Sequence, residues 1–181
     1  SPEDALGAFG GFSTLFPFRA FGRPFAVTEW NYVFPNAYRA EGGFLVGAYS
    51  ALQNYSMLCR FDYVSNPLRS VKPAHIIGFE LSNDLVARLT DLAGALFFLR
   101  GDASVSGKRF AYRIPDTDQD RFDIPDSFRE LGLIAQTGYV LDGSDKSVTV
   151  IPEKESLNSL RKKGLISSAE LAADGMRYSS T

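Results

Sequence analysis

The chain has 181 residues, of which 45% are hydrophobic, and this is enough apolar material to bury a core. Its formal net charge is -2 at pH 7, and charges of both signs are interspersed, so no basic stripe exists that would suit a phosphate backbone. No apolar stretch approaches the roughly 20 residues that cross a bilayer. A single cysteine, Cys59, excludes an intrachain disulfide and lies in an apolar run typical of an inert thiol. We therefore expect a globular protein with neither nucleic acid nor a membrane as its partner.

The first predicted element is a helix that begins in Ser1-Pro2-Glu3-Asp4, which offers a serine cap, an early proline and an acidic first turn. Phe16-Pro17-Phe18 ends it, because proline lacks the backbone donor. The chain has no initiating methionine, and its last residues, 177–181, carry neither a cap nor a turn signal. We expect a piece of a longer polypeptide.

Residues 24–64 indicate a strand, a helix and a second strand. The segment Phe25 to Thr28 is apolar almost throughout, as a central parallel strand covered on both faces would be. From Arg39 to Asn54 small and apolar residues recur at three- and four-residue spacings, which predicts a helix with one packed face. Met57 to Phe61 supplies the next strand, and a helical crossover of this length predicts that the two strands are parallel.

A polar loop from Ser65 to Pro73 follows the second strand. Ser82 or Asn83 is then predicted to cap a helix whose apolar stripe runs from Leu85 to Leu99. Gly101 suits the C-terminal end of this helix.

Beyond residue 102 the pattern changes to short apolar runs between Pro, Gly and Asp clusters. We expect a domain boundary there, with one domain over residues 1–102 and a β-rich region over residues 103–181. Tyr139–Leu141 and Ser147–Ile151 are predicted to be strands of a hairpin, because an Asp-Gly pair lies between them. The remaining predicted elements are short helices, at residues 155–163 and from residue 167.

The first of the predicted strands ends in Glu29, a carboxylate between an indole and an amide. Reacting groups lie at the carboxyl ends of strands in barrels of parallel strands. Glu29 is therefore the candidate for chemistry.

The run Pro24 to Gly42 resembles the seventh-strand region of clan A glycoside hydrolases. Phe79 to Asp84 and Leu96 to Asp102 resemble segments that follow the eighth strand in large bacterial glycosidases of the β-galactosidase and cellulase-like type. The similar segments together cover about residues 20–102, a little under half of the chain.

The resemblance implies an α/β fold, with the last strand-helix units of a (β/α)8 barrel followed by a β-rich C-terminal region. It implies a retaining glycosidase in which Glu29 is the nucleophile and a poly- or oligosaccharide is the substrate. In the family an Asn-Glu pair at the fourth strand supplies the acid/base residue, and this chain contains no Asn-Glu dipeptide. Because a complete barrel takes about 250 residues, we expect the remainder of the same polypeptide to carry the acid/base glutamate.

Two residues next to Glu29 have alternative roles. Trp30 is either a core aromatic or an apolar face for a sugar ring. Asn31 either caps the turn or donates a hydrogen bond to a sugar hydroxyl or to the carboxylate. Arg39 and Glu41, at the start of the following helix, are predicted to form a structural charge pair that orders the loop.

The other candidates for contact with the carbohydrate lie near the same carboxyl ends of the predicted strands, which we call the rim. Asp62 ends the second strand and either binds a hydroxyl or caps a loop. His75, the single histidine, is predicted to be a buried or surface residue rather than a zinc ligand, because one histidine cannot form a His-rich site. The full set of candidate contact residues is Trp30, Asn31, Tyr38, Asp62, Tyr63 and His75.

No cofactor is expected. The glycines match neither the phosphate-binding loop nor the dinucleotide fingerprint, and no Gly-x-Ser-x-Gly elbow occurs. Asp116 to Asp120 imitates the opening of a calcium loop, but Arg121 stands where glycine is required and Ser127 where the bidentate glutamate belongs. An EF-hand is excluded; a solvated loop is the favoured interpretation, and a calcium site of another kind is the alternative.

Two other functions fit the sequence. A non-catalytic carbohydrate-binding protein on a degenerate barrel would keep the aromatics and lack the acid. A structural or assembly domain with a parallel sheet would leave Glu29 as an ordinary surface residue. The sequence does not indicate the sugar, the oligomeric state or the compartment, although a secreted or periplasmic location suits a polysaccharide-degrading enzyme.

Overall fold

The computed structural model describes residues 11–72, 75–115, 125–141 and 147–167. The chain divides into two units. Among the described residues, 25–104 belong to the first unit, and 11–24 together with 105–167 belong to the second. Both units combine helices with parallel strands, so the chain has an α/β fold, and the described residues contain no closed barrel.

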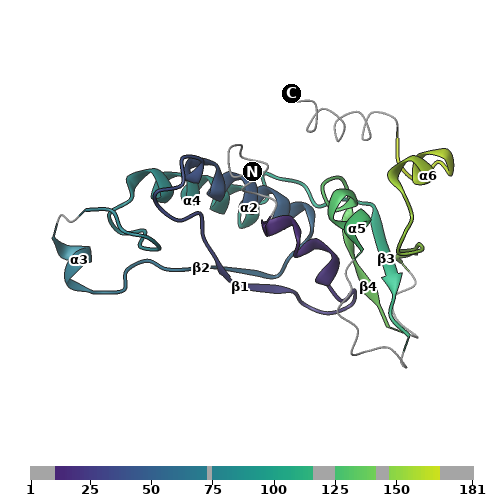
Figure 1. Cartoon of the computed structure of the whole chain (residues 1–181), viewed down its shortest axis with the longest axis horizontal. Helices are drawn as coiled ribbons and strands as arrows, with labels where there is room; N and C mark the ends of the chain where they lie inside the picture. Colours follow the sequence, from purple (N-terminus) through teal and green to yellow (C-terminus); the bar gives the residue numbers. More distant parts are fainter. Residues whose placement is uncertain (1–10, 73–74, 116–124, 142–146, 168–181) are drawn as a thin grey trace. The chain divides into compact units, whose positions relative to one another are not determined.

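The first unit is built on the predicted strand, helix and strand. Strand β1 (Ala26–Trp30) is followed by helix α2 (Arg39–Leu52) and strand β2 (Met57–Arg60), and the two strands pair in parallel as predicted. Helix α4 (Leu85–Phe98) is the helix predicted from Leu85 to Leu99, and a short helix that was not predicted, α3 (Leu68–Val71), lies in the loop before it. Figure 1 shows α2 and α4 on the same side of the strand pair.

An extra residue in β1 interrupts the register of the strand pair. Val27 lies opposite Leu58, but Trp30 lies opposite Arg60, so β1 advances by three residues while β2 advances by two. Residues two apart on β2 share a face, and Val27 and Trp30 therefore share the helix-covered face although they are three apart. This bulge leaves Thr28 and Glu29, both exposed, on the face away from the helices.

Glycines allow α2 and α4 to pack backbone against backbone. A Cβ on Gly47 would lie 2.5 Å from the Cα of Gly94, and a Cβ on Gly43 would overlap the carbonyl oxygen of Thr90. Gly94 in turn faces the carbonyl of Gly43. The helices touch along this line because no side chain stands between them.

The cap of α4 differs from the prediction. Asp84, not Ser82 or Asn83, is the N-cap residue, and its side chain accepts a hydrogen bond from the backbone of Ala87 at 3.2 Å. The reason is one of register: the helix begins at Leu85, and the cap must directly precede it. Asn83 instead donates to the carbonyl of Arg69 and to the hydroxyl of Ser82.

The second unit contains a parallel sheet, so the predicted hairpin is wrong. Strand β3 (Arg109–Arg113) is central and pairs in parallel with β4 (Gln136–Val140) on one side and β5 (Thr149–Val150) on the other. The three middle residues of β3, Phe110 to Tyr112, are buried, and a central strand satisfies both of its backbone edges by pairing with a neighbour on each side. The predicted turn over 142–146 lies outside the described residues.

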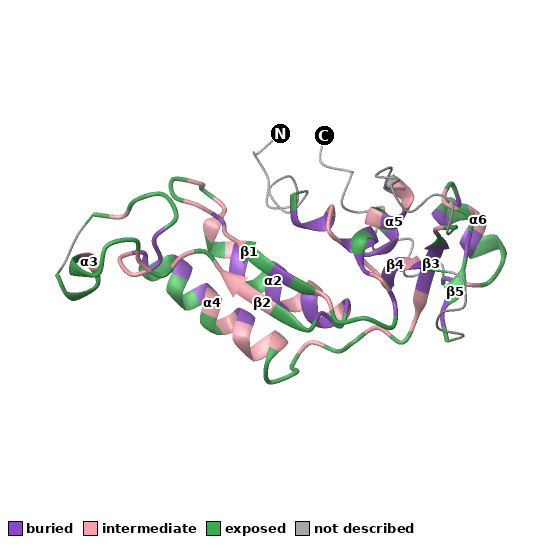
Figure 2. Ribbon diagram, turned by 90° about the horizontal axis from the view of Figure 1, so that it is seen from below, coloured by how far each residue is buried: buried purple, intermediate pink, exposed green. Residues whose placement is uncertain are grey.

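Helices complete the second unit. They are η1 (Phe16–Phe18), α5 (Asp126–Leu131) and α6 (Leu157–Lys162), the last close to the predicted 155–163. Residues 19–21 run beside β4, where Phe21 donates to the carbonyl of Tyr139 at 3.0 Å, and this places the N-terminal segment in this unit. Buried residues are purple in Figure 2, and the larger core cluster of this unit comprises Phe110, Tyr112, Phe128, Leu131, Ala135, Ile151, Leu157, Leu160 and Ile166. A second cluster comprises Phe21, Ala111, Val140 and Val148.

Other predicted features fall outside the described residues. These are the start of the N-terminal helix at residues 1–4, the loop 116–120 that imitates a calcium site, and the helix from residue 167, of which only its first residue is described. In the described part of the chain, no helix combines the length and the apolar character needed to cross a membrane.

The close approach of α2 and α4 gives a first prediction. Gly43→Ala should destabilise the first unit by about 1 to 3 kcal/mol, because the added methyl must push two backbones apart. Trp30 is the single tryptophan and lies in this unit, so urea unfolding followed by its fluorescence measures the effect. At Gly107 an added Cβ meets open space, so Gly107→Ala should leave the urea midpoint unchanged. Equal urea midpoints for the two variants would contradict the prediction.

Candidate functional site

The candidate site lies at the carboxyl edge of the β1–β2 pair. The strands are parallel, so the segments after Trp30 and after Arg60 leave the sheet at the same edge. Glu29 reaches this edge on the face that the helices do not cover, and it is exposed. A carboxylate in this position is open to solvent and to a ligand.

Asn31 fastens the two strand ends together. Its side-chain amide donates one hydrogen bond to the carbonyl of Phe61, just after β2, and another to the carbonyl of Phe79 at 2.9 Å. The peptide nitrogen of Asp62 donates to the same Phe79 carbonyl at 3.3 Å. Of the predicted roles, the structure shows Asn31 bonding the backbone of two loops; contact with a sugar stays a prediction.

The loop before α4 runs along the strand ends as an additional backbone layer. Leu81 donates to the carbonyl of Asp62 at 3.1 Å, and Ser82 donates to that of Tyr63 at 2.9 Å. On the β1 side, Phe34 donates to the carbonyl of Gly78 at 3.1 Å. This loop thereby holds the rim segments of both strands in place.

Trp30 faces the helix layer. The guanidinium of Arg60 lies 4.5 Å from the centre of its ring, and Nη1 of Arg60 bonds Oδ1 of Asp91, in α4, at 2.9 Å. Burial lowers the pKa of Arg60, although Asp91 acts in the opposite sense, and burial likewise raises the pKa of Asp91 against the effect of Arg60. This stack supports a packing role for Trp30, and its role as a sugar platform stays a prediction.

Arg39 does not pair with Glu41 as predicted. Residues two apart on a helix point in different directions. Arg39 instead bonds Asp84, the cap of α4, at 2.7 Å and lies over the ring of Phe34. Glu41 is near the buried Tyr32, whose pKa is raised by burial first and by Glu41 second.

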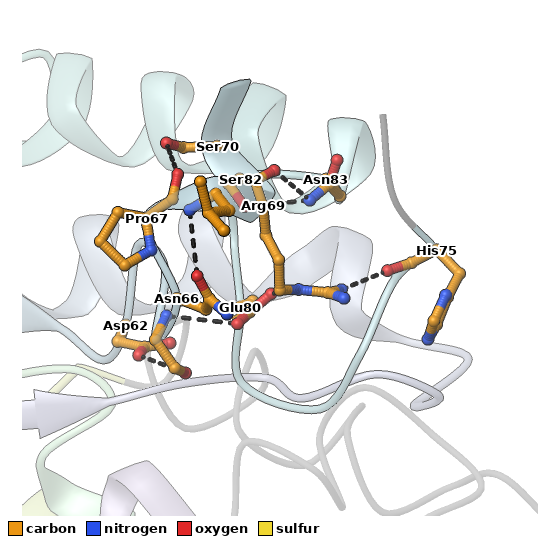
Figure 3. A network of polar contacts seen from close by, with 11 residues as sticks. Asp62, Asn66, Pro67, Arg69, Ser70, His75, Glu80, Ser82 and Asn83 are labelled. Atoms are coloured by element: carbon orange, nitrogen blue, oxygen red, sulfur yellow. Dashed lines mark hydrogen bonds and ion pairs between the residues drawn. The ribbon is translucent and has the colours of Figure 1, made fainter. Parts of the chain in front are cut away.

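A buried carboxylate, Glu80, organises the loop behind the rim (Figure 3). It is 4% exposed and pairs with Nε of Arg69 at 2.5 Å, while the peptide nitrogen of Ser65 donates to it at 3.2 Å. Arg69 also donates to the carbonyl of His75 at 2.6 Å. The hydrogen bond from Arg69 holds the pKa of Glu80 below its usual range, against the effect of burial.

The remaining predicted contact residues occupy different places. Asp62 is half-buried and accepts a hydrogen bond from the Ser65 hydroxyl at 3.0 Å, and its other oxygen is buried without a partner. Tyr63 is 55% exposed beside it. The carbonyl of His75, not its imidazole, joins the polar network, and the ring extends away from it in Figure 3. Tyr38 is the half-buried residue at the N-cap of α2.

Sequence reasoning missed an exposed pair of aromatic rings at the same edge. Phe61 and Phe79 pack edge to face with ring centroids 5.7 Å apart, and they are 42% and 55% exposed. Apolar rings that stay this exposed at the carboxyl edge of the strands offer a surface for an apolar ligand face. The available signal was weak: each phenylalanine directly precedes an acidic residue at a strand or loop end.

A metal centre finds no support in the described part of the chain, where no group of three or more His, Cys, Asp or Glu side chains is placed to hold an ion. Cys59 is a free, half-buried thiol.

The comparisons with known proteins yield no relatives. Neither a protein-family model, nor a curated protein, nor a solved structure matches this chain.

The Arg60–Asp91 pair gives a second prediction. Arg60→Gln should destabilise the first unit by about 1 to 3 kcal/mol, because Asp91 would be left half-buried without a cation, and it should change the emission of Trp30. As a control, Arg88→Gln removes an exposed arginine of α4, and its free energy of unfolding should stay within about 0.5 kcal/mol of that of the parent. The measurement is urea unfolding followed by Trp30 fluorescence, and unchanged emission in Arg60→Gln would contradict the stacking.

The pKa of Glu80 gives a third prediction. Because this pKa is lower in the folded state, the carboxylate stabilises the fold above the unfolded value, about 4.3, and the contribution is lost as the pH falls through the folded value. Glu80→Gln should therefore be less stable than the parent at pH 7, and the difference should shrink on acidification. Urea midpoints measured from pH 7 to about pH 3 test this.

Arg69→Met serves as the matched control, since it removes the other partner. In the Glu80→Gln background, Arg69→Met should lower the free energy of unfolding by less than it does in the parent. If the urea midpoints of the parent and of Glu80→Gln differed by the same amount at every pH, the lowered pKa of Glu80 would be refuted.

Proposed function

We propose that the chain carries the nucleophile of a retaining glycoside hydrolase, with Glu29 as that nucleophile and an oligo- or polysaccharide as substrate. The observation that supports it most directly is the placement of Glu29. It lies at the carboxyl end of a parallel strand, exposed on the face away from the helices, where a bulge directs it. The resemblance of the surrounding sequence to clan A glycosidases supplies the reaction type.

The architecture proposed for this function is the last part of a (β/α)8 barrel. The parallel β1–α2–β2 unit, followed by α4, has the order of two successive strand-helix units, with both helices on one face of the strands. In such a barrel the face that carries Glu29 points to the interior, toward the substrate. The second unit, with its own parallel sheet, would be an adjoining region.

The mechanism needs a second carboxyl group about 5 to 5.5 Å from the first. Glu29 would attack the anomeric carbon while the glycosidic bond breaks and the acid protonates the leaving oxygen. Water, deprotonated by the same acid/base residue, would then release the sugar and free Glu29. We propose that the acid/base glutamate comes from the remainder of the polypeptide, and that no cofactor takes part.

The rim around Glu29 suits a sugar. Pyranose rings have one face of C–H groups, and the exposed Phe61 and Phe79 offer an apolar surface at the same edge. Tyr63, 55% exposed, adds a hydroxyl that both donates and accepts hydrogen bonds. The backbone bonds made by Asn31 hold both phenylalanines in place before any ligand binds.

The same aromatic surface favours a second candidate function, a carbohydrate-binding protein without catalysis. It requires only the exposed rings and polar rim and no second carboxylate. A complete gene with no Asn-Glu pair upstream, and binding to polysaccharide without hydrolysis, would support it over the enzyme.

Substitution of Glu29 tests the enzyme. In the complete gene product, Glu29→Gln should lower the turnover of aryl glycosides by at least about 1000-fold with an unchanged melting temperature, because the side chain is exposed. An epoxide-bearing sugar should add its mass to the peptide that contains Glu29. The matched control is Glu130→Gln, an exposed glutamate of α5, which should keep full activity.

Hydrolysis by Glu29→Gln at a rate near that of the parent would contradict the role of Glu29 as nucleophile. The 181-residue chain alone should show no hydrolysis in the same assay, and activity there would refute the proposal that the acid comes from elsewhere.

A further inference from the structure

The side chain of Asn31 uses both of its amide protons within the rim. Its Nδ2 donates to the carbonyl of Phe61 and, at 2.9 Å, to the carbonyl of Phe79. A side-chain amide nitrogen carries two protons, and two carbonyl oxygens in front of the amide require its NH2 group, not its oxygen, to face them. Asn31 therefore has no donor left for a sugar hydroxyl or for the carboxylate of Glu29.

The two carbonyls belong to the residues whose rings form the exposed aromatic pair. Phe61 and Phe79 are 42% and 55% exposed, and their ring centroids are 5.7 Å apart. The carbonyl of Phe79 also accepts a hydrogen bond from the peptide nitrogen of Asp62 at 3.3 Å, so two donors hold it. One side chain, from the segment after β1, thus bonds to the backbone from which each ring projects.

Asn31 also relates these rings to Glu29. Glu29 lies two residues before Asn31, in β1, and is held there by the pairing of β1 with β2. Phe79 lies in the loop before α4, which is not part of the strand pair. The position of Phe79 relative to Glu29 therefore depends on the bonds between the segment after β1 and this loop, and Asn31 makes its bond to Phe79 itself.

We propose that Asn31 is a positioning residue, which places the aromatic pair relative to Glu29 and so sets the affinity for the sugar without touching the sugar. This rests on the proposed function, in which the rings contact the C–H face of a pyranose. Such a contact is made in the ground state and in the transition state alike, so its loss raises KM and leaves kcat nearly unchanged. The nucleophile Glu29 acts on kcat, and the two roles are thereby separable.

Kinetics of the complete gene product test this role, with the aryl glycoside that the parent hydrolyses fastest as substrate. Asn31→Ala should raise KM at least about 5-fold and change kcat by less than about 2-fold. Asn31→Asp keeps the shape of the side chain but loses both donors, and it should raise KM as much. A fraction of unfolded protein would lower the apparent kcat and leave KM unchanged, so this readout separates positioning from a loss of stability.

Asn66→Ala is the matched control. The side chain of Asn66 accepts its hydrogen bond from the peptide nitrogen of Leu68, at the start of α3, at 3.0 Å. Asn66→Ala should therefore keep the KM of the parent.

A double-mutant cycle tests whether Asn31 acts through the rings. Phe79→Ala alone should raise KM, and Asn31→Ala should raise KM by a smaller factor in the Phe79→Ala background than in the parent. Equal factors in both backgrounds would overturn the proposal. A fall in kcat in place of the rise in KM would also overturn it, as would an Asn31→Asp variant with the KM of the parent.

A failure of the proposed function is distinguishable from a failure of this inference. If the complete gene product hydrolyses no aryl glycoside, the proposed function fails, and the same variants are compared by affinity electrophoresis in gels that contain xyloglucan, mixed-linkage β-glucan or galactomannan. Weaker retardation of Asn31→Ala than of the parent, with Asn66→Ala equal to the parent, would support the positioning role. Retardation of the parent by none of these polysaccharides, or equal retardation of Asn31→Ala and the parent, would overturn it.

Discussion

The contact between the backbones of α2 and α4 is the constraint on which the first unit depends. Gly43, Gly47 and Gly94 remove the side chains that would separate the helices. With α4 held this close, its acidic residues reach cations at the carboxyl edge of the strands: Asp84 bonds Arg39 and Asp91 bonds Arg60. The helix pair therefore sets the position of the rim, because each ion pair ties one strand or loop end to α4.

The two faces of the strand pair have different physical roles. On the helix side, Trp30 and Arg60 are packed and partly removed from water, and burial shifts the pKa of Arg60 downward and that of Asp91 upward. A half-buried ion pair of this kind is weak evidence for stability, but it specifies which strand end meets which helix. On the other face Glu29 stays in solvent. The bulge in β1 sets this division, since it places Val27 and Trp30, three residues apart, on the helix side and leaves Glu29 on the other face.

The rim is ordered mainly by backbone atoms. Asn31 and the loop before α4 bond to carbonyls of Phe61, Phe79 and Tyr63, and Glu80 with Arg69 fixes that loop from behind. Side chains at the front of the rim, among them Phe61 and Phe79, are thus left exposed without being loosely held. This arrangement suits a binding surface, because the rim is already ordered and little conformational entropy is lost when a ligand binds.

The sequence by itself determined the local elements of this protein. Period and spacing located β1, α2, β2 and α4, and a crossover of one helix required β1 and β2 to be parallel. The sequence also singled out Glu29, because it ends an apolar strand. Partner choice was decided only by the tertiary structure: Arg39 bonds Asp84 rather than Glu41, Asp84 rather than its neighbours caps α4, and β3 separates β4 from β5 where a hairpin was predicted. Local periodicity follows from the geometry of one segment, whereas pairing depends on which distant groups the packed helices and strands bring within a few ångströms.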